Sequence, residues 1–233
     1  QAKQLGRNRY RLFDEAMRTR SIQQFQLEME LRHAGDNQQF QLYYQPIIDL
    51  GSGNIAGFEA LIRWQHPERG MVPPNEFIDI AEDTGLILAM GRWLLNEACC
   101  QLRQWQQLFP RETPLFIRVN LSSRQFIQPE LANMIAAIVH HHRVNPRGLK
   151  LELTESVAME DVEAAIDQLI RLKDKGLHIS LDDFGTGYSS RSYLHRFPID
   201  SLKIDKSFVD RMESIGENAD IVGTIVTLGH RLR

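Results

Sequence analysis

Apolar residues recur along this chain with two different spacings, and the two spacings alternate. In residues 75–108, 129–143 and 160–175 they return every three or four positions, which predicts helices buried on one face. Short runs of Leu, Ile, Val and Phe lie between these stretches and predict strands. Helical spacing also covers residues 8–34 and 217–233.

Six runs have the composition of strands, and polar or glycine-containing segments separate them. They span residues 40–49, 54–64, 115–122, 149–155, 178–184 and 201–208. The "GSGN" between the first two runs predicts a hairpin turn. Alternation of strands and helices in the rest of the chain predicts a mostly parallel sheet that is covered by helices.

Two α/β architectures fit this alternation, an open doubly wound sheet and a (β/α) barrel. The open fold is typically marked by a glycine-rich dinucleotide fingerprint. Here Gly185 and Gly187 form a GxG, but no third glycine completes that fingerprint. Repeated strand–helix units over most of the chain favour the barrel. The predicted fold class is therefore α/β, a TIM-like (β/α) barrel.

Polar side chains occupy one face of the predicted strands. Side chains alternate between the two faces of a strand, and helices cover the outside of a barrel, so the aliphatic faces are expected to point outward. Five polar side chains are then expected to point inward near the carboxyl ends of five strands: Glu59, Asn120, Glu152, Asp182 and Lys203. Barrel enzymes build their active sites at this end.

Three carboxylates and one amide in one place indicate a cation site, because unpaired buried charge is costly. One lysine and one arginine do not obviously neutralise them. Oxygen ligands favour Mg²⁺ or Mn²⁺ over zinc. Asp183 adds a second carboxylate beside Asp182, and two ions that share Asp182 would account for the adjacent pair. The alternative is an internal ion-pair network without catalysis.

Charge and composition narrow the range of functions. The 233 residues carry a formal net charge of −3, which argues against binding a nucleic-acid polymer. No apolar run approaches the roughly 18 residues that a membrane span needs, and no signal peptide is recognised. The two cysteines, Cys99 and Cys100, are adjacent in a helical stretch and suit buried thiols in a reducing cytosol. We therefore expect a cytoplasmic domain.

Five segments, taken in order, resemble the EAL-domain family of cyclic di-GMP phosphodiesterases. They are "FEALIRW", "VNLSSRQF", "LELTES", "LDDFGTGYSS" and "LKIDKSFV", and the resemblance runs from about "YYQPIIDL" to Arg233. The opening "AKQLGRNRYRLFDEAM" resembles the exit of a GGDEF domain. We expect residues 1–35 to form a linker helix after an upstream GGDEF or sensor domain, and residues 36–233 to form the EAL domain. Homodimer formation and membrane tethering through upstream segments are left open.

The resemblance implies a barrel with an antiparallel first strand and gives roles to individual residues. Two ions, Mg²⁺ or Mn²⁺, are implied, the first held by Glu59, Asn120, Glu152 and Asp182 and the second by Asp182 and Asp183. The implied catalytic residues are Glu59, Lys203, which contacts the attacking water, and Glu155, which anchors the loop "DDFGTGYSS". Substrate contacts are assigned to Gln45, Leu61, Arg63 and Asp205.

The implied reaction is attack of water on one phosphodiester of cyclic di-GMP, which yields linear pGpG. The alternative is a catalytically inactive EAL domain that binds cyclic di-GMP as a receptor or regulatory module. Every metal-ligand position in the sequence is intact, which favours the enzyme. Arg191 departs from the family, which usually has an apolar residue there, and the family's last two strands are expected after Arg233.

Two other motifs suggest alternative chemistry. "DFG" at residues 183–185 is also a protein-kinase signature, but the glycine-rich loop and the H-R-D motif of kinases are missing from the sequence. "HHH" at residues 140–142 resembles a metal-binding tract. It closes an amphipathic helix, where histidine suits the helix dipole, so a structural role is favoured.

Overall fold

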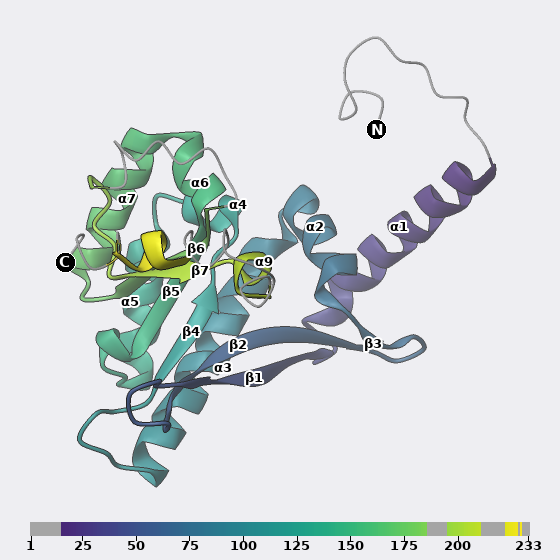
Figure 1. Cartoon of the computed structure of the whole chain (residues 1–233). Helices are drawn as coiled ribbons and strands as arrows, with labels where there is room; N and C mark the ends of the chain where they lie inside the picture. The colour runs from purple at the N-terminus through teal and green to yellow at the C-terminus, as the bar shows by residue number, and fades with distance from the viewer. Residues whose placement is uncertain (1–14, 186–194, 211–221, 228, 230–233) are drawn as a thin grey trace. The chain divides into compact units, whose positions relative to one another are not determined.

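The computed structural model describes residues 15–185, 195–210, 222–227 and 229. Two compact units make up the chain. The first contains Gln1–Gln41 and Arg63–Leu86, and the second contains Leu42–Ile62 and Ile87–Arg233. Figure 1 labels the helices and strands in chain order.

The first unit is built on two helices and a small antiparallel pair of strands. It holds α1 (Glu15–Ala34), α2 (Pro74–Thr84), β3 (Gly70–Val72) and the last residues of β2 (Ile55–His66). Trp64 is fully buried and packs edge-on against Phe77, with 5.7 Å between the ring centroids. Its indole N–H donates to Gln39 Oε1 at 2.9 Å, so the polar end of this core residue is satisfied.

The second unit is a curved sheet in which most strands run parallel. The sheet contains β1 (Phe40–Ile48), β2, β4 (Phe116–Asn120), β5 (Leu149–Thr154), β6 (His178–Phe184) and β7 (Ser201–Ile204), neighbours in this order. The pairs from β2 to β7 are parallel. A short turn joins β1 to β2, closed by Asp49 N–H and Asn54 O at 2.9 Å, so β1 runs antiparallel to β2. Among the residues described here the sheet does not close.

Helices cover the outer face of this sheet. The larger ones are α3 (Leu86–Leu108), α5 (Leu131–His142) and α7 (Val162–Asp174), and Figure 1 shows α5 and α7 beside β5 and β6. Short helices follow individual strands: α4 (Ser123–Phe126), α6 (Glu155–Glu160) and α9 (Lys206–Asp210), with a 3₁₀ turn, η1 (Pro146–Gly148), before β5. No described helix combines the length and apolar character that a membrane crossing requires.

The core lies between the outer strand faces and these helices. The outward side chains of the central strands are at most 1% exposed: Ile117, Val119, Leu149, Leu151, Leu153, Ile179 and Leu181. On α7 the buried positions Ala165, Leu169 and Leu172 repeat with helical spacing, and Asp161 caps the helix by accepting from Ala164 N–H at 3.1 Å. Alternating strand faces and amphipathic helices therefore fix which side chains point inward.

Several predicted elements differ from the structure. A single helix over residues 75–108 was wrong, because Gly85 adopts a left-handed conformation (φ 80°) that ends α2 before α3 begins. The last strand was predicted to reach residue 208 but ends at Ile204, since Asp205 starts α9 instead. The pattern also missed β3, α4 and α6, all six residues or fewer. The structure does not describe residues 8–14, Arg191 or most of residues 217–233. Within that last range, residues 222–227 are described and are helical.

Candidate active site

A lysine ammonium group stands among three carboxylates on the inner face of the sheet. Lys203 Nζ lies 3.0 Å from Glu152 Oε2, 3.0 Å from Asp182 Oδ2 and 3.4 Å from Glu59 Oε2. Burial by itself would lower the pKa of Lys203, but the carboxylates, Glu152 foremost, outweigh it and raise that pKa. We call Glu59, Glu152, Asp182 and Lys203 the inner cluster.

Asn120 joins the inner cluster through Glu59. Its side-chain amide donates to Glu59 Oε1 at 2.9 Å, and strand register sets Asn120 beside Glu152. The chain turns immediately after β4 because Ser122 and Gln125 form a reciprocal capping box at the start of α4. This cap fixes the end of the strand that carries Asn120.

Glu152 is the most buried member of the inner cluster. The residue is 1% exposed, and burial raises the pKa of its carboxyl group, while Lys203 and Arg118 oppose that shift. Oε1 lies 3.2 Å from Arg118 Nη1 in an ion pair, yet it accepts no hydrogen bond. A buried carboxylate oxygen with no hydrogen bond has a lone pair open to a further cation.

The two adjacent aspartates have different environments. Asp183 has a left-handed backbone (φ 54°), which is uncommon outside glycine, and its N–H donates to Asp182 Oδ1 at 2.8 Å. Burial raises the pKa of Asp183, and the nearby carboxylates of Asp182 and Asp205 raise it further. Asp183 shares a side-chain hydrogen bond with Asp205, so two acidic groups face each other here.

Asp205, assigned to the substrate site from the sequence, also has a structural role. It caps α9 by accepting from the Ser207 N–H at 2.9 Å and from the Ser207 hydroxyl. Its carboxylate therefore ties the end of β7 to the position of Asp183. Substrate contact by Asp205 stays a prediction.

Glu155 is buried at the start of α6 and reaches the segment after β6. Its Oε2 accepts a hydrogen bond from the Gly185 N–H at 3.1 Å. Gly185 has φ 100°, and a Cβ there would lie 3.2 Å from the Phe208 ring, so glycine suits both the conformation and the space. The rest of "DDFGTGYSS", from residue 186 on, lies outside the described residues.

The three other predicted substrate residues are located as follows. Gln45 is exposed on β1, and Leu61 is half-buried on β2, two residues after Glu59. Arg63 is half-buried and belongs to the first unit. Their contact with substrate stays a prediction.

The sequence prediction gave no role to two positively charged side chains next to the inner cluster. Arg118 and Lys150 are register partners on β4 and β5. Lys150 Nζ lies 3.6 Å from the centroid of the Phe116 ring, and burial, with Arg118 second, lowers the pKa of Lys150. Strand alternation could have placed both side chains on the inner face. It could not have identified the carboxylate with which Arg118 forms an ion pair.

The donor set fits a divalent cation. Glu59, Asn120, Glu152 and Asp182 offer oxygen atoms, and Glu152 Oε1 has no hydrogen bond. Within the described part of the chain, no group of three or more His, Cys, Asp or Glu side chains is arranged so that it could hold a metal ion. Lys203 contacts all three carboxylates and offsets part of their negative charge.

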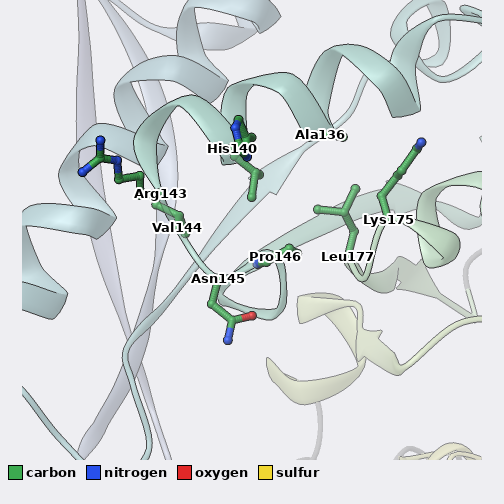
Figure 2. Close-up of a pocket in the computed structure, with 9 residues that line it drawn as sticks. Ala136, His140, Arg143, Val144, Asn145, Pro146, Lys175 and Leu177 are labelled. Atoms are coloured by element: carbon green, nitrogen blue, oxygen red, sulfur yellow. The ribbon is translucent and has the colours of Figure 1, made fainter.

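A separate cavity of about 630 Å³ lies at the opposite end of the strands. It is bounded by the end of α5 and the segments that precede β5 and β6. Figure 2 shows lining residues from both parts, His140 and Arg143 at the end of α5 and Lys175 and Leu177 before β6. Barrel chemistry belongs to the carboxyl ends of strands, so this cavity is not the candidate active site.

A protein-family model described as "EAL domain" matches residues 28–233. The chain belongs to the EAL domain family. This EAL domain is 42% identical over 231 residues to the bifunctional diguanylate cyclase/cyclic di-GMP phosphodiesterase MucR of Pseudomonas aeruginosa, covering 99% of the chain and 33% of MucR. It is 38% identical to the signaling protein YkoW of Bacillus subtilis, covering 99% of the chain and 28% of YkoW. The chain thus spans about a third of these curated relatives.

Solved structures share the fold of this EAL domain. A structure described as "PaMucR Phosphodiesterase, c-di-GMP complex" matches with a TM-score of 0.84 and 42% identity, covering 89% of this chain and 83% of that one. The FimX EAL domain of Pseudomonas aeruginosa bound to c-di-GMP matches with a TM-score of 0.78 and 25% identity, covering 89% and 82%. The TIM-like barrel class predicted from the sequence is confirmed.

Proposed function

We propose that this EAL domain is a metal-dependent phosphodiesterase that hydrolyses cyclic di-GMP to linear 5'-pGpG. The observation that carries the proposal is the convergence of Glu59, Asn120, Glu152, Asp182 and Lys203 from five strands. MucR, a relative with 42% identity, is described as a cyclic di-GMP phosphodiesterase, and its solved structure is a c-di-GMP complex. The substrate class rests on that likeness.

Glu59, Asn120, Glu152 and Asp182 would hold one Mg²⁺ or Mn²⁺ ion, and Asp182 with Asp183 a second. When bound, such ions neutralise charge on a phosphodiester and lower the pKa of a water molecule. Lys203, already fixed by contacts of 3.0 Å to Glu152 and Asp182, supplies a positive charge beside the water that attacks phosphorus.

The remaining residues position the substrate and the acidic pair. Gln45, Leu61 and Arg63 are assigned to contacts with the nucleotide. Glu155 holds the Gly185 N–H and so fixes the segment that follows Asp183. Asp205 shares a hydrogen bond with Asp183 and orients that carboxyl group.

Domain organisation is part of the proposal. Residues 1–35 would link the EAL domain to an upstream GGDEF or sensor domain, as the description of MucR as a bifunctional cyclase and phosphodiesterase supports. The described part of the linker is α1, whose Leu27 and Leu31 are buried in the first unit. A signal that moves α1 would therefore reach that unit directly.

The decisive experiment supplies cyclic di-GMP with Mn²⁺ or Mg²⁺ and separates the products by chromatography. We expect pGpG to form and EDTA to stop its formation. Glu59→Gln should lose activity, while Glu112→Gln, an exposed carboxylate before β4, should keep it. Tight binding of cyclic di-GMP with no pGpG under either metal would contradict the enzyme and leave the receptor function.

A further inference from the structure

We propose that Arg118 sets the affinity of the inner cluster for its metal ion, by supplying a fixed positive charge that competes with the ion for Glu152. The inference rests on the proposed function in one respect, namely that the inner cluster binds a divalent cation. It adds a residue that tunes that binding.

Two cations already contact Glu152, one on each carboxylate oxygen. Arg118 Nη1 lies 3.2 Å from Oε1, and Lys203 Nζ lies 3.0 Å from Oε2. The Glu152 side chain is fully buried, and that of Arg118 is 19% exposed. Water therefore screens the Arg118–Glu152 pair weakly.

Strand register and the Phe116 ring fix the position of Arg118. Parallel register sets it between Glu59 on β2 and Lys150 on β5, so its side chain shares the inner face with both. Its guanidinium carbon lies 5.7 Å from the centroid of the Phe116 ring, which also supports Lys150. The buried Arg118 Nε has no hydrogen-bond partner within the described part of the chain, so the ion pair with Glu152 is its principal polar contact.

This arrangement has opposite effects on the metal-free and the metal-bound protein. Without metal, Arg118 offsets the cost of a buried carboxylate and so stabilises the fold. With metal, the same charge repels a divalent ion that uses the same carboxylate. Repulsion between like charges that share one carboxylate should weaken binding of the ion by about tenfold or more. Arg118 would thereby keep the ion exchangeable.

The test measures Mn²⁺ affinity by calorimetry in the absence of substrate. Arg118→Met, which keeps side-chain length without charge, should tighten Mn²⁺ binding by about tenfold or more. In EDTA the same variant should melt several degrees below the wild type, and saturating Mn²⁺ should narrow that gap. Arg118→Lys keeps the charge and should bind Mn²⁺ within about threefold of the wild type.

Arg147→Met is the matched control, because Arg147 is exposed in η1 at the far end of β5 and should leave Mn²⁺ affinity unchanged. Arg118→Gln replaces Arg118→Met if the latter does not fold. Unchanged or weaker Mn²⁺ binding by the neutral variants would overturn the inference and leave the proposed function standing. A wild-type protein that binds no Mn²⁺ would overturn both.

Discussion

Lys203 Nζ lies 3.4 Å from Glu59 Oε2, although β4, β5 and β6 lie between the two strands that carry these residues. In a flat sheet, four strand spacings of about 4.8 Å would hold the two backbones roughly 19 Å apart. Two extended side chains do not span that distance with a hydrogen bond. The sheet must therefore curl toward its inner face. The ion pair thus requires barrel-like curvature, although the described strands leave the sheet open.

Glu59→Ala should abolish turnover. The change removes a proposed metal ligand, the acceptor of the Asn120 amide and one contact of Lys203. Loss of metal-based charge stabilisation should lower the rate by on the order of 10³-fold or more. Initial rates of pGpG formation at saturating Mn²⁺ measure this effect. A variant that retains near-normal rates would refute the ligand role of Glu59.

Lys203→Met should slow the chemical step without weakening metal binding, because lysine supplies charge and is not a ligand. It should also destabilise the metal-free protein by about 1–3 kcal/mol. Breaking a buried ion pair costs about 3–5 kcal/mol, and here the lysine side chain is 30% exposed. Single-turnover rates, Mn²⁺ titration and urea unfolding in EDTA separate these effects. A variant whose main defect is loss of bound Mn²⁺ would contradict this role of Lys203.

The positions of the inner cluster could be predicted because strand alternation is a property of the backbone. Glu152 and Asp182 each follow a buried aliphatic neighbour, so their side of the strand was fixed by Leu151 and Leu181. The contact between Arg118 and Glu152 could not be predicted, since it depends on register and on the curl of the sheet.

Two of the wrong element boundaries, the end of α2 and the end of β7, could have been recognised from the sequence. Gly85 follows Thr84 at the end of an amphipathic stretch, which is the usual place for a left-handed helix end. Asp205 and Ser207 form a helix-start signal that apolar alternation in "SLKIDKSFV" concealed. In contrast, β3 has three residues, too few for any periodicity to show.

Glu155→Ala should act on the segment after Asp183 and leave the carboxylates of the inner cluster in place. Glu155 Oε2 accepts from the Gly185 N–H, so its loss should speed hydrogen exchange at that amide and weaken the second metal ion more than the first. Glu155→Gln keeps an acceptor oxygen and should retain more protection. Lost activity with unchanged exchange at Gly185 would instead make Glu155 a direct participant in the reaction.

Because of His178, the free energy of unfolding should decrease as the pH falls from 6.5 to 4. Burial, with Lys150 second, lowers the pKa of His178 from 6.5 to about 4, so the folded state favours the neutral ring. The unfolded chain binds the proton first as pH falls. Stability from this group is therefore fully present above pH 6.5 and is lost as pH approaches 4.

Between pH 7 and pH 5 the loss from His178 should amount to about 2 kcal/mol. Urea unfolding of the wild type and of His178→Gln, both in EDTA, measures it as a difference in slope with pH. Carboxylates away from position 178 titrate in both proteins, so their contribution cancels in that difference; Asp200, which lies 3.8 Å from His178 Nδ1, is the exception. His140→Gln, at an exposed histidine on α5, should follow the wild type. If His178→Gln also followed the wild type, the ring at position 178 would have to be accessible to protonation in the folded state.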